Sequence, residues 1–315
     1  MEEIKIPLSV PNDKKGEYNK NYRYLTNGSG RLLLIAGDQK VEHLNDDFFG
    51  SGINSEDNGP EHLFQIAAAS RGGVLATHLG LISRYGQTYR QIPYIVKING
   101  KTNIGSTEKD SSRIWWTVAD VIRFKKQSGL KVVGIGYTLY LGSQFEAKML
   151  AEAAAAILAA HQAGLTAIIW VYPRGRNIKE EDIHTIAGGA GVAASLDADF
   201  VKVKYPYDAP DKKRTAEKFR EVSAAAGRTK IICVGGSKRP VKELLEYLEK
   251  QVKISGASGL AMGRNMHQRP LAEASRLSAA IGAILFHNKN AAEALRIYLN
   301  KEKPKPRTSR FLGLF

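Results

Sequence analysis

Two lysines stand two positions apart in an otherwise apolar run in the second half of the chain. The run Asp199–Tyr205 reads DFVKVKY, and because side chains alternate along a strand, Phe200, Lys202 and Lys204 would share one face. If that face points into a confined interior, desolvation and the second cation lower the pKa of a lysine, and its neutral amine becomes a nucleophile for a ketone. Lysines at a strand end can instead reach solvent or bind a phosphate. The spacing alone leaves these interpretations open.

Side chains suited to proton transfer also follow apolar runs at the points where strands would end. Tyr172 closes the run TAIIWVY and shares a face with Trp170, and Asp38 directly follows RLLLIAG. A positioned phenol or carboxyl group can pass a proton to or from a reacting atom. The alternatives are that the tyrosine only packs and that the aspartate caps the following turn.

Glycines end the last two apolar runs, with a serine after the first of them and an arginine after the second. Gly235 and Gly236 precede Ser237, and Gly263 precedes Arg264. Glycines let backbone N–H groups approach a phosphate closely, and a guanidinium matches phosphate oxygens in geometry. Each glycine alone could simply turn the chain. Together, in the two loops where barrels often bind phosphate, they predict a phosphate site.

The elements that must position these groups alternate along the chain between strands and helices. The strand runs are nearly continuous in apolar residues, as expected for a parallel sheet covered on both faces, and helical patterns lie between them. Eight such runs predict an α/β fold, a (β/α)8 TIM barrel. An open doubly wound sheet would normally carry a Gly-x-Gly-x-x-Gly turn after its first strand, where this chain has Gly37-Asp38-Gln39-Lys40. The predicted strands are Arg31–Gly37, Gly73–His78, Tyr94–Ile98, Val132–Tyr137, Thr166–Tyr172, Asp199–Tyr205, Lys230–Gly235 and Ser258–Gly263.

Helices are predicted between these strands, and the ends of the chain differ in character from the barrel. Residues 1–30 are polar and predict an N-terminal arm or outer cap, 31–290 the barrel, and 291–315 a helix end with a basic tail. Two stretches, 51–60 and 100–112, resemble loop insertions. The predicted helices are Glu61–Arg71, Ser112–Gln127, Gln144–Ala163, Glu180–Leu196, Thr215–Ala226, Pro240–Ser255 and Pro270–His287.

Composition narrows the class of partner. The 315 residues carry 46 Lys+Arg against 31 Asp+Glu, a formal charge of +15, which favours anionic partners such as a phosphorylated metabolite or nucleic acid. The sequence contains no recognised nucleic-acid-binding motif, so we do not expect nucleic acid as a partner. No apolar run reaches 18 residues and the single cysteine, Cys233, cannot form an internal disulfide, so we expect no membrane contact and a cytoplasmic location. The seven histidines include no His-x-His or His-Glu-x-x-His pair, so no metal is expected.

Seven blocks, in order along the chain, resemble the archaeal-type class I fructose-1,6-bisphosphate aldolases, a group that includes the DhnA-like bacterial enzymes. Single blocks are not specific, but their combination from about residue 31 to 290 is. The blocks are AGDQKVEH (36–43), VKINGKT (96–102), GYTLYLGS (136–143), WVYPRG (170–175), ADFVKVKY (198–205), VGGSK (234–238) and GRNMHQR (263–269).

The resemblance implies a metal-independent lyase that reversibly cleaves fructose 1,6-bisphosphate to dihydroxyacetone phosphate and glyceraldehyde 3-phosphate, as in glycolysis and gluconeogenesis. It implies Lys202 as the Schiff-base lysine, Tyr172 as the acid/base and Asp38 as an assistant in proton transfer. No separate cofactor is implied, and the assembly would be a homo-oligomer, often a decamer. Residues expected to contact substrate or phosphate are Trp170, Arg174, Lys204, Gly235, Gly236, Ser237, Gly263, Arg264 and His43.

Departures from the family pattern bear on specificity. The family usually has Asp-His after the first strand, where this chain has Asp38-Gln39, and often a serine where this chain has Val234. The N-terminal arm, the insertion at 50–60 and the basic tail lie outside the pattern. Alternatives are the sister activities of the superfamily, namely 2-amino-3,7-dideoxy-D-threo-hept-6-ulosonate synthase and DhnA-like sugar-phosphate aldolases or thiolases. A basic nucleic-acid-binding protein is a more distant one.

Overall fold

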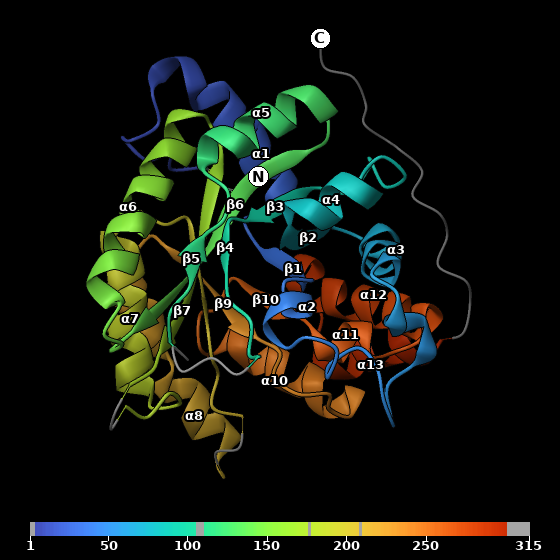
Figure 1. The fold of residues 1–315 in the computed structure, drawn as a ribbon. Helices are drawn as coiled ribbons and strands as arrows, with labels where there is room; N and C mark the ends of the chain where they lie inside the picture. The colour runs from blue at the N-terminus through green and yellow to red at the C-terminus, as the bar shows by residue number, and fades with distance from the viewer. Residues whose placement is uncertain (1–3, 105–109, 176–177, 208–209, 301–315) are drawn as a thin grey trace.

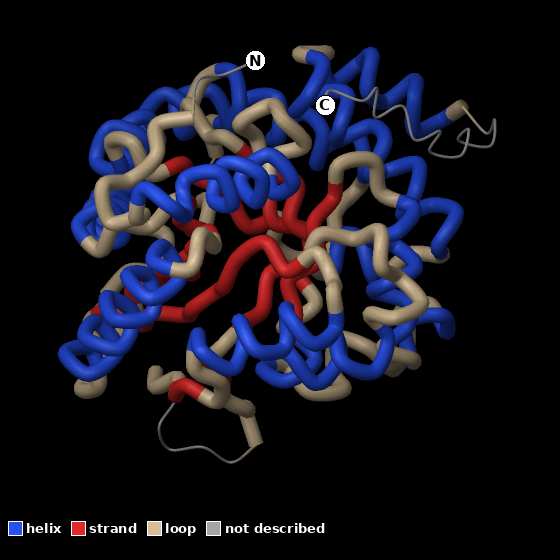
Figure 2. Tube along the Cα trace, turned by 90° about the horizontal axis from the view of Figure 1, so that it is seen from above, coloured by secondary structure: helices blue, strands red, loops and turns tan. Residues whose placement is uncertain are grey.

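Eight parallel strands close into a barrel in the computed structural model, which describes residues 4–104, 110–175, 178–207 and 210–300. The order around the barrel is β1-β10-β9-β8-β7-β6-β3-β2, so each strand lies beside its neighbour in sequence and the last pairs with the first. The predicted (β/α)8 barrel is thereby confirmed (Figures 1 and 2). The barrel strands are β1 (Leu32–Ala36), β2 (Gly73–His78), β3 (Tyr94–Lys97), β6 (Val132–Leu141), β7 (Thr166–Pro173), β8 (Phe200–Val203), β9 (Lys230–Val234) and β10 (Gly259–Met262).

Helices surround the ring of strands, as the view down the barrel shows (Figure 2). Two 3-10 turns, η1 (Asn12–Lys14) and η2 (Ser55–Asn58), and a two-stranded antiparallel pair, β4 (Asn99–Gly100) with β5 (Arg113–Ile114), complete the described chain. The helices are α1 (Lys15–Leu25), α2 (Gln39–Glu42), α3 (Glu61–Ala69), α4 (Leu79–Tyr85), α5 (Val118–Ser128), α6 (Glu146–Gln162), α7 (Ile183–Ser195), α8 (Lys212–Lys218), α9 (Arg220–Ala226), α10 (Val241–Lys253), α11 (Arg264–His267), α12 (Leu271–His287) and α13 (Ala291–Leu299).

Some element boundaries differ from the sequence-based predictions for local reasons. The helix predicted from Ser112 begins only at Val118, because Arg113 and Ile114 pair with β4 and a capping box between Thr117 and Asp120 starts α5. The helix predicted over 215–226 is split into α8 and α9. The fourth strand runs four residues beyond its predicted end, because β6 pairs with β7 as far as Leu141. The described residues end at Asn300, so the predicted basic tail, residues 301–315, lies outside them.

Side chains of each strand alternate between two apolar layers. Leu33 and Ile35 of β1 belong to the large layer between barrel and helices, whereas Leu32 and Leu34 belong to the lumen. The strands are buried on both faces, which explains why their sequences read as continuous apolar runs rather than alternating ones.

The described part of the segment before β1, residues 4–30, packs against the N-terminal end of the barrel, as an outer cap would. Helix α1 places Tyr18, Tyr22 and Leu25 in the same apolar cluster as the lumen, with the ring of Tyr22 5.9 Å from that of Phe200. The Tyr18 hydroxyl donates a hydrogen bond to Asp199, which also accepts from His161 at 3.1 Å. The polar composition of this segment did not indicate that its tyrosines would be buried against the barrel. The aromatic side chains of α1 thus pack against this end of the lumen, and the cavity that contains Lys202 opens at the opposite end, where the strands end.

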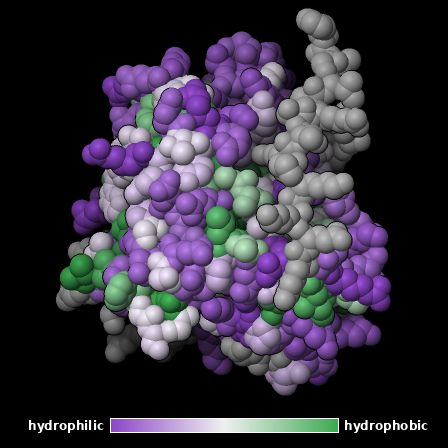
Figure 3. Space-filling view, turned by 90° about the vertical axis from the view of Figure 1, so that its right-hand side faces the viewer, coloured by the Kyte–Doolittle hydropathy of each residue, from purple (hydrophilic) through white to green (hydrophobic). Residues whose placement is uncertain are grey.

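The surface shows no extended apolar face in the view of Figure 3, where hydrophilic residues predominate and hydrophobic ones form small separate groups. Within the described ranges, no helix has the length and hydropathy needed to cross a membrane.

Candidate active site

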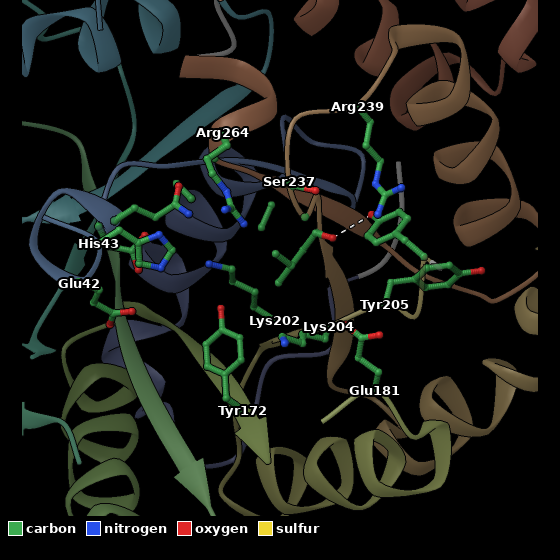
Figure 4. A pocket seen from close by; sticks show the side chains of 18 of the residues that line it. Glu42, His43, Tyr172, Glu181, Lys202, Lys204, Tyr205, Ser237, Arg239 and Arg264 are labelled. Atoms are coloured by element: carbon green, nitrogen blue, oxygen red, sulfur yellow. Dashed lines mark hydrogen bonds between the residues drawn. The ribbon is translucent and has the colours of Figure 1, made fainter. Parts of the chain in front are cut away.

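A cavity of about 320 Å³ opens where the barrel strands end. It gathers side chains from β1, β7, β8 and the loops after β9 and β10, and Figure 4 shows Tyr172 and Lys202 pointing toward its centre. Trp170 and Gly235 are not on its wall. The sequence-predicted residues that line it are Asp38, His43, Tyr172, Arg174, Lys202, Lys204, Gly236, Ser237, Gly263 and Arg264.

Lys202 is the most deeply placed amine on the cavity wall. It lies in β8, only 4% exposed, and its Nζ sits 5.1 Å from the centroid of the Trp170 ring on the adjacent strand. Burial lowers the pKa of Lys202, against the opposing effect of the nearby carboxylates Asp38 and Glu42. The lysine therefore carries a larger fraction of neutral amine near neutral pH than an exposed lysine would.

Trp170 lies beneath the lysines, is 1% exposed and is not among the residues that line this cavity, so its contact with substrate stays a prediction. Its ring also faces a second buried amine, because the Nζ of Lys97 stands 5.7 Å from the centroid. The ring therefore forms a floor that keeps water away from both amines and offers its negative face to any positive charge formed there.

Lys97 differs from Lys202 in having its hydrogen bonds satisfied by the protein. Its Nζ donates to the backbone oxygen of Asn99 at 2.8 Å and to Oδ1 of the same residue at 3.0 Å. Asn99 is itself fixed by donating from Nδ2 to the backbone oxygen of Thr138 at 2.8 Å. Lys97 does not line the cavity, so Lys202 is the better placed nucleophile.

Two carboxylates face the lysines from the segment after β1. Burial alone would raise the pKa of Asp38, but the charges of Lys202 and Lys97 outweigh it and lower that pKa. Asp38 Oδ1 is buried with no hydrogen-bond partner in the described part of the chain, which leaves it available to a substrate hydroxyl. Glu42 was missed in the sequence, although it stands four residues after Asp38, a spacing that brings side chains to one side of a helical turn.

Tyr172 is held by stacking. Its ring lies 6.1 Å from that of Tyr140, and the guanidinium of Arg174 lies 5.1 Å from its centroid. Burial, reinforced by Glu42 and Asp38, raises the pKa of Tyr172 far above that of a free phenol. The side chain therefore keeps its proton at neutral pH and can donate it within the cavity.

The loops after β9 and β10 bring glycine, serine and arginine to one cavity, here called the cradle, and phosphate binding by it stays a prediction. Gly236 adopts φ +69°, a conformation that favours glycine, and Gly263 and Arg264 line the same cavity. Asn265 ties the loops together, because its Nδ2 donates to the backbone oxygens of Gly235 at 2.8 Å and Ser237 at 2.7 Å. Gly235 therefore helps to hold the two loops together, although it does not line the cavity itself.

A separate group of charges occupies the side of the cavity formed by the ends of β7 and β8. Glu180 pairs with both Arg174 and Lys204. Both predicted phosphate-binding cations on this side are therefore already partnered. His43, on the opposite wall, is paired with Asp47.

The cavity also contains residues that the sequence did not single out. Apart from the spacing of Glu42 from Asp38, no local signal identifies them, because the closed barrel decides which side chains near the strand ends face the cavity. No group of three or more His, Cys, Asp or Glu side chains within the described ranges is arranged to hold a metal ion. The unforeseen lining residues include Gln39, Glu42, Glu181, Tyr205, Tyr207 and Arg239.

A closed (β/α)8 barrel with a desolvated lysine, a buried phenol and a glycine-lined cradle at the carboxyl ends of its strands has the arrangement of a barrel aldolase. The chain belongs to the DeoC/LacD family of aldolases, whose pattern matches residues 32–269.

Known relatives agree with this class. The chain is 53% identical over 303 residues, 96% of each protein, to a fructose-bisphosphate aldolase/6-deoxy-5-ketofructose 1-phosphate synthase of Methanocaldococcus jannaschii. Its structure matches a fructose-bisphosphate aldolase from Slackia heliotrinireducens with a TM-score of 0.92 and 46% identity, over 98% of both chains. It also matches an archaeal fructose-1,6-bisphosphate aldolase whose catalytic lysine is bound to the carbinolamine intermediate, with a TM-score of 0.72 and 28% identity over 85% of this chain and 99% of that one.

Proposed function

We propose that this protein is a class I fructose-1,6-bisphosphate aldolase in which Lys202 forms the Schiff base. The observation that carries the proposal is the buried Lys202 amine on the cavity wall, between the Trp170 floor and the phosphate cradle. The metabolic setting in glycolysis or gluconeogenesis, the cytoplasmic location and the homo-oligomeric assembly that the resemblance implies form part of the same proposal.

The geometry accounts for the steps of such a cleavage. Neutral Lys202 Nζ adds to the C2 carbonyl, and the resulting carbinolamine loses water to give an iminium ion. Removal of the proton from the C4 hydroxyl breaks the C3–C4 bond, releases the aldehyde and sends the electron pair into the iminium, forming an enamine. The enamine is reprotonated at C3, and water releases dihydroxyacetone phosphate and the free lysine. No external oxidant or metal enters the balance.

The proton transfers fall to the two groups that face Lys202. Tyr172 keeps its phenolic proton, so it can protonate the departing hydroxyl of the carbinolamine and recover a proton from the C4 hydroxyl. Asp38 is ionised, so it stabilises the iminium cation and can orient a substrate hydroxyl through its unpartnered Oδ1.

The direct test is incubation with fructose 1,6-bisphosphate and measurement of both triose phosphates, in the presence and absence of a chelator. Borohydride is then added during turnover, and the trapped adduct is mapped to a peptide. We expect equal amounts of the two products, no effect of the chelator and an adduct on Lys202. An adduct on Lys97 or Lys204 would overturn the residue assignment, and absence of products and adduct from folded protein would overturn the function.

The pH dependence of adduct formation follows from the charges around Lys202. Because burial lowers the pKa of Lys202, trapping at subsaturating dihydroxyacetone phosphate should rise with pH and level off below the ordinary lysine value of about 10.4. The negative charge of Asp38 opposes that lowering, so Asp38→Asn should move the midpoint to still lower pH. A midpoint that stays in place or rises in the variant would contradict this electrostatic account.

A second candidate activity is suggested by the pairing of Glu180. The name 6-deoxy-5-ketofructose 1-phosphate describes a sugar with a single phosphate, a C5 ketone and a C6 methyl group, so its C3–C4 cleavage gives dihydroxyacetone phosphate and the uncharged aldehyde 2-oxopropanal. Because Glu180 neutralises part of the charge of Arg174 and Lys204, that side of the cavity attracts a second phosphate less strongly than two free cations would. This favours an enzyme that accepts both kinds of aldehyde.

Replacing Glu180 with glutamine is therefore expected to shift acceptor preference. The variant frees two cations, so the ratio of kcat/KM for glyceraldehyde 3-phosphate to that for 2-oxopropanal should rise about tenfold. Both reactions are measured in the direction of synthesis with dihydroxyacetone phosphate as donor. Glu181→Gln is the matched control, because Glu181 lines the same cavity and is the adjacent acid. An unchanged or lower ratio in Glu180→Gln would show that this pairing does not set acceptor choice.

A further inference from the structure

A fully buried aspartate–histidine pair lies directly behind the phosphate cradle. Asp57 Oδ2 and His267 Nδ1 are 2.6 Å apart, and the two side chains are 0% and 1% exposed. The imidazole is also stacked on Phe48, with ring centroids 4.6 Å apart and planes 9° apart. Asp57 comes from the turn η2, inside the 50–60 insertion, and His267 from the turn after β10. None of the proton transfers derived above uses this pair.

The pair reaches the cavity through one side chain. His267 Nε2 lies 3.3 Å from Oε1 of Gln39, which lines the cavity. The contact between Nε2 and the Gln39 oxygen needs a proton that only the ring can supply, so Nε2 donates to that oxygen, and a second proton lies between Nδ1 and Asp57. This fixes the Gln39 amide with its oxygen turned to His267. Its Nε2 has no hydrogen-bond partner in the described part of the chain and keeps two N–H donors for a ligand.

The same amide rests against the cradle. A Cβ added to Gly263 would stand 2.0 Å from Gln39 Oε1, so the absence of a side chain at 263 allows the amide to approach the β10 loop. Arg264, the next residue, lines the cavity beside it. The uncharged amide of Gln39 therefore lies at the edge of the phosphate cradle, where its two N–H groups can donate hydrogen bonds to an anion.

We propose that Gln39 is a phosphate-binding residue of this site, and that Asp57 and His267 are positioning residues that keep its N–H groups turned toward the phosphate. The phosphate identity rests on the proposed function, whereas the orientation of the amide rests on the buried pair alone. The 50–60 insertion thereby contributes to substrate binding without touching the substrate.

The test compares ligands with and without a phosphate. In Gln39→Leu we expect KM for dihydroxyacetone phosphate to rise about tenfold and the affinity for inorganic phosphate, measured by calorimetry, to fall by a similar factor. The rate of borohydride trapping with unphosphorylated dihydroxyacetone should change by less than about twofold, because that ligand never engages the amide. Gln91→Leu, an exposed glutamine outside the cavity, is the control. Equal losses with both ligands would show that Gln39 only supports the fold.

Asp57→Asn tests the positioning role without removing a contact to substrate. Asparagine at 57 can accept from Nδ1–H but cannot hold the second proton as the carboxylate does, so Nε2 then presents a lone pair. The Gln39 amide turns an N–H group to that lone pair and its oxygen toward the phosphate. We expect the same rise in KM as in Gln39→Leu, and no further rise when the two substitutions are combined. Additive effects in the double variant, with its thermal unfolding unchanged, would overturn the relay.

The phosphate titration also separates this inference from the proposed function. If no aldolase activity is found but Gln39→Leu and Asp57→Asn both weaken binding of inorganic phosphate, the anion site stands and only the reaction is wrong. If the enzyme is active but phosphate affinity is the same in wild type and both variants, the role of Gln39 is wrong and the aldolase proposal is unaffected.

Discussion

Lys202→Met is expected to lower kcat for cleavage of fructose 1,6-bisphosphate by about four orders of magnitude or more. Methionine fills a similar volume on the Trp170 floor but offers no nucleophile, so neither carbinolamine nor iminium can form. Turnover is measured by coupled detection of triose phosphates, and covalent capture by intact mass after borohydride treatment with dihydroxyacetone phosphate. The variant should show no adduct.

Lys97→Met is the matched control for this experiment. Lys97 is buried on the same ring, but its donors are satisfied by Asn99 and it does not line the cavity. An adduct should therefore still form on Lys202 in this variant, even where loss of the Asn99 contacts slows turnover. If Lys202→Met were trapped normally and Lys97→Met were not, the nucleophile would have to be reassigned to Lys97.

Tyr172→Phe should separate the chemistry after adduct formation from binding. Loss of the phenolic proton donor is expected to lower kcat about 100-fold or more, with KM changed far less. The phenyl ring preserves the stack on Tyr140, so the cavity keeps its shape. Single-turnover trapping should still label Lys202, but more slowly than in the wild type, because the phenol also protonates the departing hydroxyl of the carbinolamine. Exchange of the C3 proton of dihydroxyacetone phosphate with deuterated water should slow in parallel with kcat.

Tyr140→Phe is the natural comparison, because Tyr140 is the stacking partner and does not line the cavity. Its turnover should stay within about threefold of wild type. Similar large losses in both variants would mean that the aromatic pair matters for packing, and Tyr172 would lose its role as acid/base.

The sequence was most informative where local rules decide the outcome. Alternation along a strand predicted that Lys202 and Lys204 share a face, and both line the cavity; the glycines after β9 and β10 marked two loops that also line it. The sequence did not predict how far below the cavity wall each strand side chain would lie. Trp170 lies one layer below the wall because its partner in register, Lys202, extends over its ring toward the strand ends.

Residues supplied by loops were harder to foresee. Glu180 is six positions beyond Arg174, and only the closure of the β7 and β8 ends brings it between Arg174 and Lys204. Asp57 and His267 are 210 positions apart, so no local pattern could join them. For the insertion that contains Asp57 the sequence predicts only a loop, because polar composition does not distinguish an exposed loop from one that buries a single carboxylate.

The helix that closes the amino-terminal end of the barrel also constrains the order of events in biosynthesis. Tyr18 is made early, but Asp199, which accepts its hydrogen bond, is made 181 residues later, and the last barrel strand follows later still. A nascent chain interrupted after β6 therefore lacks two ring partners of α1, because His161, which Tyr18 contacts, and Phe200, which Tyr22 contacts, are not yet made. Such long sequence separations slow folding and lengthen the time during which apolar surface is open to aggregation. We therefore expect docking of α1 to be a late step, completed only after synthesis is nearly finished, and the growing chain to depend on chaperones during that interval.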